Sequence, residues 1–89
     1  MNCTVANNGG AGIFIYDGSL VIGNIVYYNG QLGMYCRTGC TLKDNVVYSN
    51  EYVGIESISH SLIDGNTAYD NSPNISSCGT CTLGTNHIP

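Results

Sequence analysis

The chain has 89 residues, a net charge of −4 and only 9% charged side chains, far below the usual quarter of a soluble domain. Its two basic residues are too few for the cationic surface that a nucleic-acid backbone requires, so we predict no nucleic-acid partner. No apolar run is long enough to span a membrane, and no secretory signal opens the chain. We expect one domain over residues 1–89 and no membrane partner. The location is expected to be extracellular or periplasmic if the segment comes from a longer precursor, and cytoplasmic otherwise.

A repeat of about 21 residues runs through the chain. Segments that begin and end with Asn recur at residues 2–7, 24–29, 45–50 and 66–71, and a further Asn stands at position 86. Each segment is followed by a short polar loop and then by a pair such as Gly33-Met34 or Gly54-Ile55. Self-similarity at this period predicts stacked supersecondary units. No segment shows an apolar helical period, so these units are predicted to be built from strands.

Alternating apolar residues predict three short strands in each repeat, at roughly residues 12–16, 19–23 and 25–28 in the first one. Stacking the repeats gives three columns of side chains that are expected to point into a core. These columns are Ile13, Met34, Ile55 and Ile75; Val21, Leu42, Ile63 and Leu83; and Val26, Val47, Ala68 and Ile88.

The same pattern resembles a known family. The pairs Gly33-Met34 and Gly54-Ile55, together with the run from Ile63 to Asn71 (sequence IDGNTAYDN), are similar to the right-handed parallel β-helix repeats of the pectate-lyase-like superfamily, including its NosD-like members. The resemblance implies an all-β fold: a right-handed, single-stranded parallel β-helix of about four 21-residue coils with three short strands each. It implies no particular chemistry, because the superfamily holds lyases, hydrolases, epimerases, tailspikes and proteins without enzymatic activity.

The repeated Asn residues are predicted to form a structural ladder. An amide side chain both donates and accepts hydrogen bonds, so stacked amides can bond along the axis and to turn backbone. A polar binding stripe is the alternative interpretation. The residues concerned are Asn2, Asn24, Asn45, Asn66 and Asn86.

Three tyrosines, Tyr27, Tyr48 and Tyr69, form a column expected on the outside of the third strand. Such a row can stack on sugar rings or on another subunit, or it can simply cover the sheet, with each ring pair adding about 0.5 to 1.5 kcal/mol. Together with Tyr35 on the outer face of the first strand, these are the candidate carbohydrate-binding residues, and a glycan is the candidate ligand.

Five cysteines are many for so short a chain. Cys36 and Cys40 flank one turn, and Cys78 and Cys81 flank another, so each pair could close across its turn. The two spacings resemble a zinc site on paper, but an intervening coil separates the pairs and disfavours a shared tetrahedral site. We expect reduced cysteines that fill the core, with Cys36–Cys40 as the first disulfide to form under oxidising conditions.

An active site is not evident. Hydrolysis of a glycoside needs two carboxylates at a set separation. The outer faces offer only two predicted surface ion pairs, Arg37 with Glu56 and Lys43 with Asp64. We predict no catalytic residue, no metal ligand and no cofactor.

The sequence shows no capping helix at either end, although end coils of a solenoid expose apolar core and unpaired strand edges. We therefore predict a homo-oligomer, most simply a two-fold dimer through one coil end. The predicted function is a non-enzymatic module that associates with itself through its open coil ends and binds carbohydrate on its tyrosine face. The alternative is a fragment of a polysaccharide lyase or a glycoside hydrolase.

Overall fold

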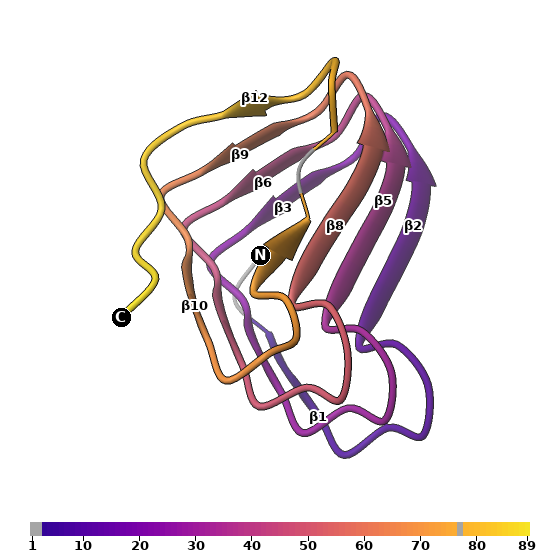
Figure 1. Ribbon diagram of the computed structural model, residues 1–89. Coiled ribbons are helices and arrows are strands. Elements are labelled where there is room, and N and C mark those ends of the chain that lie inside the picture. Colours follow the sequence, from indigo (N-terminus) through magenta and orange to yellow (C-terminus); the bar gives the residue numbers. More distant parts are fainter. Residues whose placement is uncertain (1–2, 77) are drawn as a thin grey trace.

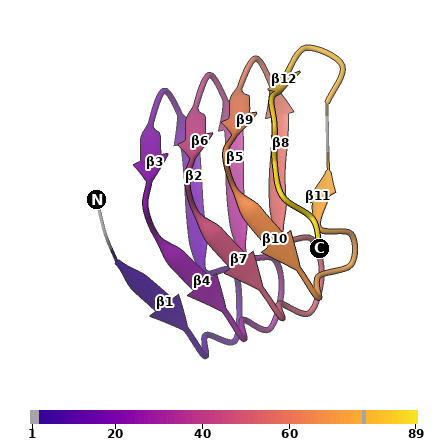
Figure 2. The ribbon, with the colours of Figure 1, turned by 90° about the vertical axis from the view of Figure 1, so that its left-hand side faces the viewer.

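The computed structural model describes residues 3–76 and 78–89, which form twelve short strands and no helix. The strands stack in three parallel sheets, as Figures 1 and 2 show from two directions. The first sheet holds β1 (Thr4–Ala6), β4 (Ile25–Tyr27), β7 (Val46–Tyr48) and β10 (Thr67–Tyr69). The second holds β2 (Ile13–Asp17), β5 (Met34–Thr38), β8 (Ile55–Ser59) and β11 (Ile75–Ser76). The third holds β3 (Leu20–Ile22), β6 (Thr41–Lys43), β9 (Leu62–Asp64) and β12 (Thr82–Leu83).

The chain passes from the first sheet to the second, then to the third, and returns one level further along the stack. Val26 pairs with Val47 and Leu42 with Ile63, 21 residues on in each case. The last coil is one residue shorter, because Ile75 pairs with Ile55 and Leu83 with Ile63. The predicted all-β parallel solenoid of about four coils, with three short strands in each, is confirmed. The predicted strand ends differ from the observed ones by about one residue.

The core is a column of apolar side chains inside the three sheets. Met34, Leu42, Val47, Ile55 and Ile63 are fully buried, as the alternation predicted. The prediction is wrong at the last coil, where Leu83 and Ile88 are 50% and 51% exposed. Leu83 lies in coil four and Ile88 just beyond it, and no described residues form a further coil over either side chain.

Each corner of the coil uses one residue in the left-handed backbone region. The three columns of such residues are Gly18, Gly39 and His60; Gly23, Asp44 and Gly65; and Asn7, Tyr28, Ser49 and Asp70. Glycine enters this region freely, whereas other residues do so less readily. The strict 21-residue spacing shows that the fold dictates the conformation, because residues as different as Tyr28 and Ser49 share it.

The first amide ladder runs through Asn24, Asn45, Asn66 and Asn86. The backbone N–H and Nδ2 of Asn45 both donate to Oδ1 of Asn66, at 2.9 and 3.0 Å, and Asn45 Nδ2 also donates to the Val21 carbonyl at 2.9 Å. Every described Oδ1 in this ladder accepts from the coil before it, so the ladder has a direction. Its first position is taken by Cys3, whose N–H donates to Asn24 Oδ1; the predicted member Asn2 lies outside the described residues.

A second amide ladder, which the sequence did not predict, lies at the next corner. Asn8, Asn29, Asn50 and Asn71 are bonded in series, with N–H and Nδ2 donating to the Oδ1 one coil on. Asn29 and Asn50 are buried. Asn29, Asn50 and Asn71 are the residues that end the repeated segments, and in the first coil Asn8 rather than Asn7 is the member in register.

The cysteine pairs are bonded, so the prediction of reduced cysteines is wrong for four of the five, and the fifth, Cys3, is exposed rather than in the core. Cys36 is joined to Cys40 and Cys78 to Cys81, with Cα atoms 6.4 and 5.2 Å apart, within the range that a disulfide spans. The first pair is buried in the core, as expected. In the coil between the two disulfides, the hydroxyls of Ser57 and Ser61 join the same two positions by a 2.7 Å hydrogen bond.

Candidate functional site

The tyrosine column is a continuous stack on the first sheet. Tyr27, Tyr48 and Tyr69 are in register, with ring centroids 4.9 Å apart in each step and interplanar angles of 9° and 5°. Tyr28 adds a fourth ring that meets Tyr27 and Tyr48 edge-on, at 5.2 and 6.2 Å between centroids. The flanking rings partly bury the ring of Tyr48, and burial followed by the neighbouring tyrosines raises the pKa of its hydroxyl above the ordinary value.

Tyr35 does not join this column. It lies in β5 of the second sheet, where its ring stacks on Phe14 at 4.6 Å between centroids. Phe14 in turn meets Tyr16 edge-on at 5.6 Å. The four candidate carbohydrate-binding residues therefore lie on two separate faces, and the aromatic surface of the second sheet is a distinct patch.

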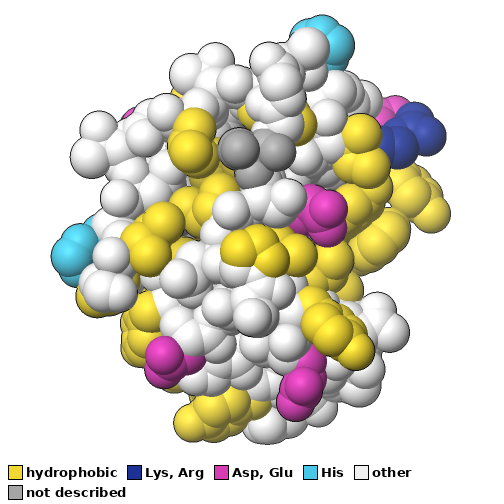
Figure 3. Space-filling model, viewed as in Figure 1, with side chains coloured by type: hydrophobic (Ala, Val, Ile, Leu, Met, Phe, Trp, Pro, Cys, Tyr) yellow, Lys and Arg dark blue, Asp and Glu magenta, His cyan; other side chains and the backbone are white. Residues whose placement is uncertain are grey.

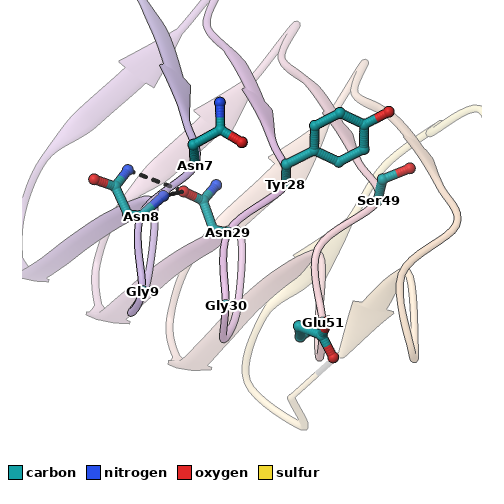
Figure 4. Close-up of a pocket in the computed structure, with 8 residues that line it drawn as sticks. All are labelled: Asn7, Asn8, Gly9, Tyr28, Asn29, Gly30, Ser49 and Glu51. Atoms are coloured by element: carbon teal, nitrogen blue, oxygen red, sulfur yellow. Dashed lines mark hydrogen bonds between the residues drawn. The ribbon is translucent and has the colours of Figure 1, made fainter.

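A shallow trough of about 380 Å³ lies beside the tyrosine column, at the corner that carries the second amide ladder. Its floor holds Asn8 and Asn29, which are hydrogen-bonded to each other (Figure 4). The left-handed residues Asn7, Tyr28 and Ser49 line one side, and Gly9, Gly30 and Glu51 complete the lining.

Two glycines shape the trough in different ways. A Cβ on Gly30 would come within 2.6 Å of the Gly9 carbonyl oxygen, so no larger residue fits there without displacing backbone. A Cβ on Gly9 would meet nothing within 4 Å, which shows that the space beside it is empty of protein. The trough combines amide, hydroxyl, carboxylate and aromatic groups, which is the chemistry that a polyhydroxylated ligand can engage. The recurrence of Gly at the 21-residue spacing was its sequence signal.

The N-terminal end of the stack carries an apolar depression of about 360 Å³. It opens where the core ends, and its lining includes Cys3, Val5, Ile13, Ile15, Leu20 and Val21. The three strands that form this end, β1, β2 and β3, are free along their outer edges among the described residues (Figure 2).

These edges carry almost no charge. The sequences of β1, β2 and β3 contain one charged residue, Asp17. Its carboxylate accepts hydrogen bonds from Nε and Nη2 of Arg37, at 3.1 and 2.9 Å, and this partnership raises the pKa of Arg37. The predicted Arg37–Glu56 pair is therefore wrong, because the guanidinium of Arg37 is bound by Asp17 in the coil before it rather than by Glu56 in the coil after it.

The second predicted ion pair is also wrong. Lys43 and Asp64 are in register on neighbouring strands, but no salt bridge joins them in the described structure. Asp64 Oδ1 instead accepts the backbone N–H of Thr85 at 2.9 Å, so this carboxylate helps to hold the last turn. Among residues 3–76 and 78–89, no group of three His, Cys, Asp or Glu side chains is placed to hold a metal ion. The same residues contain no helix that could cross a membrane.

The C-terminal end is built differently. Oδ1 of Asn74 accepts from N–H and Nδ2 of Asn71, so the second ladder is closed by a residue only three positions on. Beyond β10, His87 forms a single parallel bridge to Thr67, which adds a fifth level to the first sheet. Hydrophobic side chains on this end lie in several groups, separated by backbone and other side chains (Figure 3).

Three parallel sheets wound by one chain, with amide ladders at the corners, define a parallel β-solenoid. Over residues 1–88 the sequence matches the family described as right handed beta helix region. The chain belongs to this family. No curated protein and no solved structure matches this chain.

Proposed function

We propose that this protein is a non-enzymatic β-helix module that associates with itself through an open coil end. The observation that carries the proposal is the N-terminal end, which joins an apolar depression to three strand edges whose only charged residue is Asp17. Natural proteins protect such edges with charges, proline or covering elements, since an unprotected edge pairs readily with another strand. A second copy supplies both the apolar surface and the strand edges that this end lacks.

Sedimentation velocity over a wide concentration range tests self-association. We expect the sedimentation coefficient to rise with concentration toward that of a dimer. A chain that stays monomeric at every concentration would contradict the proposal, and an added coil from a longer polypeptide would then be the better partner for this end.

A second function, carbohydrate binding, is favoured by the tyrosine column and the adjoining trough. The stack presents parallel rings, and Tyr28 connects it to the amides and hydroxyls of the trough. A glycan array tests this function with the unchanged chain and the variant Tyr48→Ala. Tyr52→Ala is the matched control, because Tyr52 is exposed and takes no part in the column. Glycan signal that falls with Tyr48→Ala alone would support binding, whereas absence of signal from all three chains would leave only self-association.

The non-enzymatic part of the proposal is supported by how the carboxylates are used. Asp17 is bound by Arg37, and Asp64 accepts from the backbone of Thr85. The alternative is a fragment of a polysaccharide lyase or a glycoside hydrolase within the pectate-lyase-like superfamily, a placement that the 21-residue coil and the Asn ladder support. Incubation with polygalacturonate and other plant polysaccharides, followed by assay of unsaturated products and reducing ends, distinguishes the two. Product formed by the 89-residue chain would favour the enzyme fragment.

A further inference from the structure

We infer that two copies join their N-terminal ends about a two-fold axis that crosses the middle of β2, so that Ile15 faces Ile15 of the second copy. The inference rests on the proposed self-association and specifies its geometry. The geometry follows from the order in which β1, β2 and β3 occur along the chain at the N-terminal end.

At the N-terminal end, the three edge strands lie at different heights along the solenoid axis. The chain makes β1, then β2, then β3, and one full coil advances by one strand spacing of about 4.8 Å. Each successive strand therefore lies roughly a third of that spacing further from the end, which makes β1 the most protruding strand and β3 the most recessed.

A two-fold axis through the centre of β2 makes the uneven N-terminal end of one copy complementary to the same end of the second copy. It places β2 antiparallel to its own copy, with Ile15 at the centre of the five-residue strand. It also places β1 opposite β3 of the second copy, and these strands are equal in length, at three residues each. The most protruding strand then meets the most recessed one, so the separations at the three edges are equal. All three edges gain antiparallel partners, and the two apolar depressions close on each other.

Head-to-tail stacking does not fit in the same way. At the C-terminal end the first sheet has a fifth level at His87, whereas the second and third sheets end at β11 and β12. If β1 of another copy paired with the His87 segment, its β2 and β3 would lie two levels beyond β11 and β12, and one level would stay empty between them. The second ladder would not continue either, because the Asn74 side chain already fills the acceptor position beyond Asn71.

Charge complementation at residue 15 tests the axis. We expect Ile15→Lys and Ile15→Glu each to weaken self-association about 100-fold, because like charges would face each other across the interface. A mixture of the two variants should restore a dimer of one copy of each. Leu83→Lys, on the exposed edge of β12 at the other end, should associate like the unchanged chain. Sedimentation velocity measures association, and far-UV circular dichroism checks that each variant is folded.

Each outcome is informative. Loss of association in Leu83→Lys, with dimers recovered on mixing it with Ile15→Lys, would overturn the two-fold geometry in favour of head-to-tail stacking and leave self-association intact. A monomeric unchanged chain would overturn self-association itself. If the Ile15 variants do not fold, Leu20→Lys replaces them, since Leu20 is 67% exposed on the edge strand β3. Equal association of Leu20→Lys and the unchanged chain would then contradict the inference.

Discussion

The inner coils and the end coils of this solenoid use the same residues with different results. Leu42 and Leu83 occupy the same column, yet Leu42 is fully buried and Leu83 is half exposed. In the same way, Oδ1 of Asn29 accepts two hydrogen bonds from the coil before it, whereas no described residue donates to Oδ1 of Asn8. The energy of a column position depends on having a coil on both sides. Inner coils therefore hold the fold together, and end coils keep surface and hydrogen-bonding groups free for a partner.

The largest contrast is expected from truncating the two leucines. Leu42→Ala should lower the free energy of unfolding by about 2 to 5 kcal/mol, because it leaves a cavity between two coils. Leu83→Ala should lower it by less than about 1 kcal/mol, because the side chain is half in solvent. Urea unfolding at one fixed protein concentration measures both. Similar losses for the two variants would show that the last coil is as well packed as the inner ones.

The amide ladder should show a smaller contrast of the same kind. Asn45→Ala should cost about 2 to 4 kcal/mol of unfolding free energy, because it leaves the buried donors of Asn24 without an acceptor. Asn86→Ala should cost about 1 kcal/mol, since water reaches the partly buried donors of Asn66. Chemical denaturation compares the two variants, and a larger loss for Asn86→Ala would place the critical bonds at the end of the stack.

Thiol alkylation should distinguish the cysteine at the N-terminal end from the four other cysteines without any mutation. Cys3 is exposed at the N-terminal end, and the other four cysteines are in disulfides. Alkylation of the native protein without reductant should add one label, and alkylation after reduction and unfolding should add five. Mass spectrometry counts the labels. Five labels without reductant would rule out both disulfides. Labelling of Cys3 should also slow as protein concentration rises, because self-association covers that end.

The smallest effect concerns pH. The pKa of Tyr48 is raised in the folded chain, so the folded state favours the neutral hydroxyl more than the unfolded state does. Its stabilising effect is complete below the ordinary tyrosine pKa, near pH 10, and is lost as pH rises through the higher folded value. Ultraviolet absorbance should show Tyr48 ionising above the ordinary tyrosine pKa, as the difference between titrations of the unchanged chain and of Tyr48→Phe. A Tyr48 midpoint at the ordinary tyrosine value would indicate that the stack does not shield this hydroxyl.

The sequence predicted the repeating part of the fold well, because each column residue has the same neighbours in every inner coil. It failed where that condition ends. Leu83 and Ile88 follow the pattern but lie exposed, and Asn74 departs from the pattern to close a ladder. The ion partner of Arg37 was also mispredicted, because adjacency in sequence columns leaves open whether the coil before or the coil after supplies the acid. The trough beside Tyr28 was missed, since it depends on the open space beside Gly9 and the close approach of Gly30 to the Gly9 backbone rather than on any reactive residue.

The left-handed corners have one more consequence. Each inner coil contains three of them at a fixed 21-residue interval, so any two inner coils present interchangeable surfaces to their neighbours. A gene segment that encodes one such unit can be duplicated or deleted in whole multiples without disturbing the contacts on either side of the junction. Each added or deleted coil thus changes the length of the solenoid by about 4.8 Å, while its two terminal surfaces stay the same.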